Sequence, residues 1–177
     1  AIFAVGKAIG GRGVGLWAAD NTQMFYDEKI SADKIVEAMA AAQRHIHQGP
    51  LQVGMALHHG TFWEIGLGMF GLDAEILEQA AEELTSAKEI IVSETVHKML
   101  DKSYQFNLSL REDVDLKPAF YSLNYDDYGH EFAEHVDDFD VFDRSYHYPL
   151  PFSSEFFVAL KQMDISKDAR LKLNNFF

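Results

Sequence analysis

The spacing of apolar residues predicts three helices in the first 124 residues. One helix begins after the N-cap residue Ser31 and ends before Gly49-Pro50. Its inward positions recur at helical spacing: Ile35, Val36, Met39, Ala42 and Ile46. A second helix follows Gly71, with Asp73 as its cap. Its apolar face comprises Ile76, Leu77, Ala80, Ala81 and Leu84. Ser93 caps a third, shorter helix.

Short apolar, β-compatible stretches separate these helices. Residues 1–9 and 14–19, divided by glycines, predict an opening hairpin. Three single strands are predicted at 51–57, 62–69 and 90–92, and residues 104–125 alternate like a closing hairpin. The order strand, strand, helix, strand, strand, helix, strand, helix, hairpin predicts an α+β fold, an antiparallel sheet with helices packed on one face.

The chain changes character at Tyr125, so we predict one domain over 1–124 and a C-terminal extension over 125–177. Residues 126–143 carry eight carboxylates and no Lys or Arg, yet aromatic residues interrupt the charge. Disordered acidic tails are usually poor in aromatics. We therefore expect this acidic, aromatic-rich extension to pack on the preceding domain and Ser153 to cap a further helix. We also expect residues 145–152 or a second subunit to cover an exposed sheet edge.

Composition narrows the classes of protein. A hydrophobic content of 47% over 177 residues is enough for a packed core. The formal net charge of −13 argues against nucleic acid as a partner. Without cysteine there is no thiolate nucleophile and no Cys-ligated zinc. No apolar run approaches the roughly 20 residues of a membrane helix, so we expect a soluble, cytoplasmic protein without membrane insertion.

Several segments, in a consistent order, resemble the catalytic domain of the class III nucleotidyl cyclases, the adenylate and guanylate cyclases. Residues 6–14 (GKAIGGRGV) are similar to the family's K-x-I-G-D-G hairpin, and 51–60 (LQVGMALHHG) to its L-x-V-x-I-G-I-H-x-G strand. Gly71 and the helix that follows take the place of G-D-x-V-N-x-A-x-R, and 89–96 (EIIVSETV) resemble E-I-L-V-S-E-x-x. The resemblance covers about residues 1–124.

The resemblance implies a ferredoxin-like antiparallel sheet and a head-to-tail pair of domains with sites at their interface. The family converts ATP or GTP into a 3′,5′-cyclic monophosphate and pyrophosphate. Two aspartates hold two divalent cations for this reaction. An Arg and an Asn hold the transition state and ribose, and a Lys with a second residue reads the purine base.

Lys7 matches the family's base-reading lysine, so the resemblance makes it a candidate purine contact. Gly11 stands where the second metal aspartate belongs, and its neighbour Arg12 adds positive charge there. The first metal aspartate belongs to a strand and helix upstream of this hairpin, and the sequence starts after them. We therefore expect no metal site in this chain, and Mg²⁺ or Mn²⁺ only if the domain is an active cyclase.

On the helix after Gly71, Glu75 occupies the family's Asn position and Gln79 its Arg position. Loss of the guanidinium removes the charge that stabilises a phosphoryl-type transition state. Gly68 stands at the position of the second base reader. No basic residue occurs between Asp73 and Leu84, so we expect no catalytic residue here.

The histidines and acidic clusters do not form another recognisable site. His130 and His135 are five residues apart, whereas the zincin signature places its histidines four apart. Residues 124–135 fail as an EF-hand because Tyr128 and His135 occupy ligand positions. His58 falls on a family position that commonly holds histidine for structural reasons, so a packing role is expected.

Three functions follow from these observations. The first is a catalytically degenerate cyclase-like domain that acts as a dimerising or nucleotide-sensing regulatory module, paired with a second copy or a related cyclase-like domain. The second is an active class III cyclase whose metal-binding residues come from an absent segment or a partner. The third is a structural interaction domain whose acidic tail covers the former active-site groove.

Overall fold

The computed structural model describes residues 1–14, 22–65, 68–105, 107–112 and 116–136. The chain divides into two compact units, Ala1–Asp140 and Val141–Phe177. The second unit lies outside the described residues, as do the predicted helix after Ser153 and residues 145–152. All of the described residues belong to the first unit.

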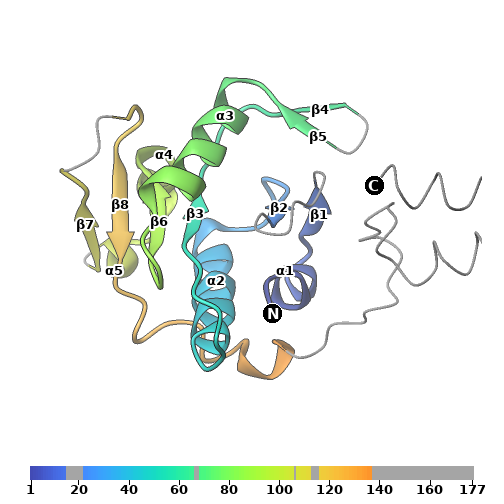
Figure 1. Cartoon of the computed structure of the whole chain (residues 1–177), viewed down its shortest axis with the longest axis vertical. Helices are drawn as coiled ribbons and strands as arrows, with labels where there is room; N and C mark the ends of the chain where they lie inside the picture. Colours follow the sequence, from blue (N-terminus) through green and yellow to red (C-terminus); the bar gives the residue numbers. More distant parts are fainter. Residues whose placement is uncertain (15–21, 66–67, 106, 113–115, 137–177) are drawn as a thin grey trace, which may run out of the picture. The chain divides into compact units, whose positions relative to one another are not determined.

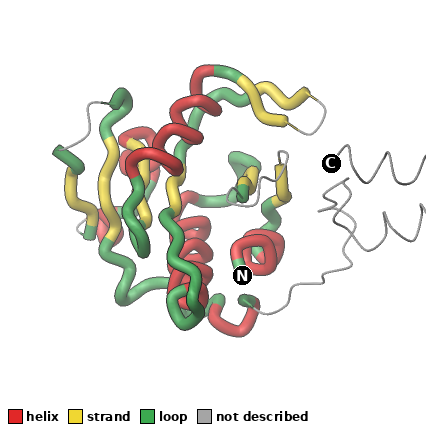
Figure 2. The backbone as a smooth tube through the Cα atoms, in the orientation of Figure 1, coloured by secondary structure: helices red, strands yellow, loops and turns green. Residues whose placement is uncertain are grey.

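The elements of the first unit follow one another in a mixed order (Figures 1 and 2). The helices are α1 (Ile2–Ala8), α2 (Ala32–Ile46), α3 (Leu72–Gln79), α4 (Glu94–Met99) and α5 (Lys102–Gln105), with a π-helical turn η1 (Ala80–Leu84) after α3 and a 3₁₀ turn η2 (Ala133–His135). The strands are β1 (Arg12–Val14), β2 (Gln23–Phe25), β3 (Met55–Leu57), β4 (Trp63–Ile65), β5 (Gly68–Phe70), β6 (Ile90–Ser93), β7 (Leu108–Leu110) and β8 (Phe120–Leu123). None of the helices in these described ranges has the length and apolar character needed to cross a bilayer.

The central sheet has four strands in the order β3-β6-β8-β7. Strands β6, β8 and β7 pair antiparallel, whereas β3 pairs parallel with β6 in the register Met55 to Ile90. The parallel pair is joined by a crossover that contains β4, β5 and α3, as parallel pairing requires. The fold is therefore α+β, but the expectation of a wholly antiparallel sheet is wrong. The predicted closing hairpin is confirmed as β7 and β8.

Helical elements contact both faces of this sheet, so the predicted packing on one face is also wrong. Side chains along a strand alternate between faces. Ile90 and Val92 of β6 lie in the larger core, to which α1, α2 and α4 contribute. Ile91 lies in a smaller core with Phe120 and with Ala80 of η1. All three β6 residues are fully buried because each face of the strand is covered.

The N-terminal segment is a helix, not the strand that its apolar residues predicted. Phe3, Ala4 and Val5 of α1 are buried, and α1 packs against α2. The helix ends in a Schellman motif, in which Gly10 N–H donates to Lys7 O and Gly11 N–H donates to Gly6 O. Gly10 has a φ of +97°, which glycine adopts without strain. The glycines that predicted a hairpin turn thus end a helix.

The long helix α2 forms where the spacing predicted it. Ser31 is its N-cap, and the Ser31 hydroxyl accepts a hydrogen bond from Lys34 N–H. Eight of its residues are buried, more than any other helix described contributes to a core. In Figure 1, α2 stands beside β3 and α1. The stretch predicted as one strand at 62–69 instead forms the antiparallel hairpin of β4 and β5.

The described start of the predicted extension packs on α2. The Arg44 guanidinium donates to the backbone carbonyls of Tyr125, Asp126 and Tyr128. The Glu37 carboxylate accepts from Gly129 N–H and from the Tyr104 hydroxyl. Phe132 and Val136 of this stretch belong to the larger core, and the partly buried Tyr125 and Tyr128 pack against it.

Candidate functional site

Gly11, the position matched to a metal aspartate, lies where a side chain has no room. A Cβ added there would lie 2.8 Å from Cδ1 of Tyr26 and 2.9 Å from the backbone oxygen of Gly6. Such distances are well below van der Waals contact. An aspartate could occupy position 11 only if the Tyr26 ring and the end of α1 moved.

Arg12, the cation beside Gly11, is engaged by a carboxylate from the β4–β5 hairpin. Its two terminal nitrogens donate to the two Glu64 carboxylate oxygens at 2.7 Å each, and its guanidinium lies 4.8 Å from the centre of the Phe25 ring. The hydrogen bond from Arg12 lowers the pKa of Glu64. Both side chains are about half exposed, so solvent screens the pair. This pair ties β1 to β4.

The remaining candidate residues lie on α1, which belongs to the larger core, and on α3, which lies beside the smaller core. Lys7 is exposed in the last turn of α1. Glu75 and Gln79 are exposed on α3, where Gln79 donates to the Glu83 carboxylate at 3.1 Å. The structure does not gather these three residues around a common pocket.

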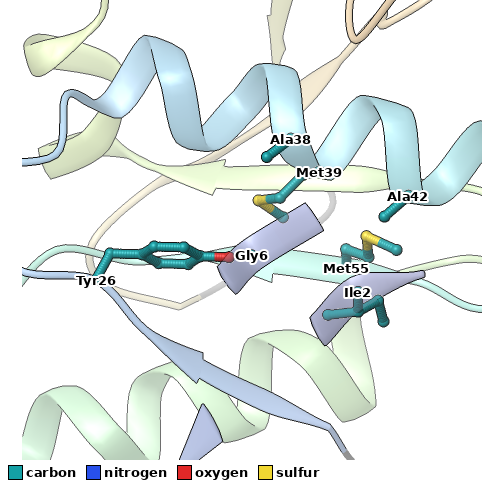
Figure 3. A pocket seen from close by; sticks show the side chains of 7 residues that line it. All are labelled: Ile2, Gly6, Tyr26, Ala38, Met39, Ala42 and Met55. Carbon is teal, nitrogen blue, oxygen red and sulfur yellow. The ribbon is translucent and has the colours of Figure 1, made fainter. Parts of the chain in front are cut away.

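The cavity beside α1 is too small and too apolar for a nucleotide. Its volume is about 20 Å³, and Figure 3 shows the Tyr26 hydroxyl pointing toward Gly6. The other lining residues are Ile2, Ala38, Met39, Ala42 and Met55. Ligand pockets are usually at least several hundred Å³. A larger surface hollow of about 480 Å³ lies between Ala1 and residues 45–51, away from all three candidates.

A polar contact that the sequence did not predict joins His58 to Asp73. The His58 side chain is only 1% exposed, and its Nε2 lies 2.9 Å from Asp73 Oδ1. An ionised carboxylate only accepts, so Nε2 carries the proton of this hydrogen bond. Asp73 Oδ2 also accepts from Thr61 N–H at 2.7 Å. The hydrogen bond from His58 is the main cause that lowers the pKa of Asp73.

The prediction that Asp73 caps α3 is therefore wrong, whereas the packing role expected of His58 is confirmed by its burial. Gly71 is the N-cap of α3 and Asp73 lies inside the first turn, where its side chain reaches back to the turn after β3. Gly60 permits this approach, because a Cβ there would lie 2.7 Å from Asp73 Cβ. On the other side, the Thr95 hydroxyl donates to His59 O at 2.9 Å. These contacts fix residues 58–61 between α3 and α4.

Among the described residues, no group of three or more His, Asp or Glu side chains is placed to hold an ion. His58 and Asp73 are two such side chains in direct contact, and they hold the turn at 58–61 onto α3.

No protein-family model matches the chain, and no curated protein matches it either.

Proposed function

We propose that this chain is a catalytically degenerate, cyclase-like domain that acts as a dimerising regulatory module. The observation that carries the proposal is the Tyr26 ring, which fills the space that an aspartate side chain at Gly11 would need. Without that carboxylate, one of the two cations required for cyclisation has lost a ligand. The ferredoxin-like ancestry of the fold is part of the same proposal and rests on the motifs at 51–60 and 89–96, because residues 6–11 end a helix and do not form the family's hairpin.

Electrostatics supports the loss of catalysis. A triphosphate needs positive charge that strengthens as the transition state forms. Arg12 is already engaged with Glu64, and Leu72–Leu84 carries several carboxylates but neither Lys nor Arg. Glu75 would repel the phosphates at the position where the family places a neutral Asn. These residues therefore lack the charges that metal-assisted cyclisation requires.

Incubation of the full chain with ATP or GTP and Mn²⁺, followed by detection of cyclic nucleotide, tests the catalytic part. We expect no product above a no-protein blank. Turnover that disappears in Lys7→Ala and persists in the matched exposed variant Lys29→Ala would overturn the proposal.

Sedimentation velocity over a range of concentrations tests the pairing part. We expect a reversible species of twice the 20.0 kDa chain mass. Isothermal calorimetry with ATP and GTP tests the nucleotide-sensing version: heat that is lost in Lys7→Ala, without turnover, would assign sensing to the domain. A chain that remains monomeric and binds no nucleotide would overturn the regulatory module in both forms.

A further inference from the structure

The β4–β5 hairpin exposes two large apolar side chains in directly opposed positions, and the start of α3 exposes a third two residues further along the chain. Trp63 and Phe70 are directly opposed in the register of the hairpin, and Leu72 begins α3 two residues later. Their exposed fractions are 67%, 51% and 72%. The Trp63 ring also lies against Gly71, where an added Cβ would be 3.2 Å from Trp63 Cδ1. We call Trp63, Phe70 and Leu72 the hairpin patch.

Single exposed apolar residues are ordinary, but adjacent ones with a polar rim mark an interaction surface. In Figure 1 the hairpin projects from the first turn of α3, away from the four-stranded sheet. Tryptophan and phenylalanine are well suited to anchor protein contacts, because a rigid ring buries a large area with little loss of rotamer entropy.

The surface beside the patch is acidic. Ile76, Ala80 and Leu84 face the smaller core, so the opposite side of α3 and η1 faces solvent. Its exposed carboxylates are Glu75, Glu78, Glu82 and Glu83. No Lys or Arg lies between Leu72 and Leu84, and the nearby Arg12 is paired with Glu64. A partner therefore meets an apolar anchor site with net negative charge along one side.

We propose that the hairpin patch and the adjoining face of α3 bind a basic amphipathic segment of another protein, with apolar side chains on one face and Lys or Arg beside them. The apolar face would cover Trp63, Phe70 and Leu72, and the cations would lie along Glu75 and Glu78. A second copy is a poor occupant of this patch, because it would bring the same acidic face to the contact.

This inference does not rest on the proposed function, since it requires neither nucleotide nor pairing of the domain. The probe is a fluorescently labelled helical peptide of about 18 residues, roughly five turns, with leucines along one face and lysines elsewhere. Anisotropy titrations with the full chain would use low and physiological salt. Of two control peptides, one has the same composition with scrambled leucines, and the other has glutamates in place of the lysines.

We expect micromolar binding of the amphipathic lysine peptide, and at least about tenfold weaker binding to Leu72→Ser and to Trp63→Ser. Glu75→Gln combined with Glu78→Gln should weaken binding about three- to tenfold at low salt and flatten its salt dependence. Leu51→Ser is the matched control, because Leu51 is 70% exposed but lies outside the patch. It should bind like the wild type.

Two results would overturn the proposal. Equal binding of the scrambled peptide, or equal weakening by Leu51→Ser, would show charge attraction without a defined surface. Conversion of a dimeric wild type into a monomer by Leu72→Ser would show that a second copy covers the patch. The three exposed substitutions leave the core intact, and circular dichroism checks that each variant is folded.

Discussion

The helices α2 and α3 lie on opposite sides of the same sheet and differ in how many of their residues are buried and in what their polar side chains contact. Eight residues of α2 are buried, whereas none of Leu72–Gln79 in α3 is. Arg44 and Glu37 of α2 hold the chain at 125–129. The outer face of α3 carries carboxylates, and its main polar contact is Asp73 with His58 and Thr61. The comparison indicates that α2 is a structural helix of the core, whereas the outer face of α3 is available for contacts with other molecules.

One glutamine on each helix allows a matched test, and it carries the largest expected effect. Gln43 is fully buried in α2, and its Nε2 donates to Val53 O at 2.8 Å and Glu89 O at 3.3 Å. Gln43→Arg would bury a charge without a carboxylate partner in this contact, which costs about 3–5 kcal/mol. Gln79→Arg, exposed on α3, should change the free energy of unfolding by less than about 0.5 kcal/mol.

Urea titration followed by circular dichroism measures both variants. Comparable losses at positions 43 and 79 would contradict the division between a structural helix and a surface helix. A Gln43→Arg protein that fails to fold, beside a normally folded Gln79→Arg protein, agrees with it.

The next largest effect is expected at Gly129, where the chain crosses α2. Gly129 has a φ of +79°, and a Cβ there would lie 2.7 Å from Glu37 O and overlap Ala41 N. Gly129→Ala should therefore lower the free energy of unfolding by about 2–3 kcal/mol, because it strains the backbone and forces residues 125–129 off the helix. The urea midpoint measures this loss.

Gly49→Ala is the control, since its Cβ would meet Ile46 O at 3.4 Å, with a φ outside the left-handed region. It should lie within about 0.5 kcal/mol of the wild type. A Gly129→Ala protein as stable as Gly49→Ala would mean that residues 125–129 are not held on α2 in solution.

The elements predicted well from the sequence are those with a local and complete signal. For α2, the Ser31 cap, a long 3.6-residue period and the Gly49-Pro50 stop all indicate the same helix. For α1, Lys7 is the one polar side chain of the run 1–9, so the period of that run could not distinguish helix from strand, and Gly10 fits both a turn and a helix end. The unbroken apolar run Ile90-Ile91-Val92 is itself a signal of helices on both faces, because strands buried on both faces lack alternation.

The polar contacts were less accessible to sequence reasoning than the helices. His58 and Asp73 are separated by a hairpin, and Arg12 and Glu64 by the whole of α2, so no spacing rule joins either pair. The packing role of His58 was predicted, but its partner required the structure. Tyr26, the residue that fills the space beside Gly11, carries no motif that would have identified it.

The smallest effect is expected at Asp73, and it depends on pH. The hydrogen bond from His58 lowers the folded-state pKa of Asp73 below its ordinary 3.8. A carboxyl group with a lowered pKa stabilises the fold above its unfolded pKa, and this contribution is lost as the pH falls through the folded pKa.

Asp73→Asn should therefore lower the free energy of unfolding by about 1 kcal/mol at neutral pH, a modest value because the side chain is 30% exposed. The difference from wild type should shrink as the pH falls below the ordinary pKa of 3.8 and through the folded-state pKa, measured by urea titration at each pH. Glu75→Gln, which removes an exposed carboxylate from the same helix, is measured beside it as the control. If Asp73→Asn loses the same stability at every pH, the contact between α3 and the turn at 58–61 depends on shape and not on the ionised carboxylate.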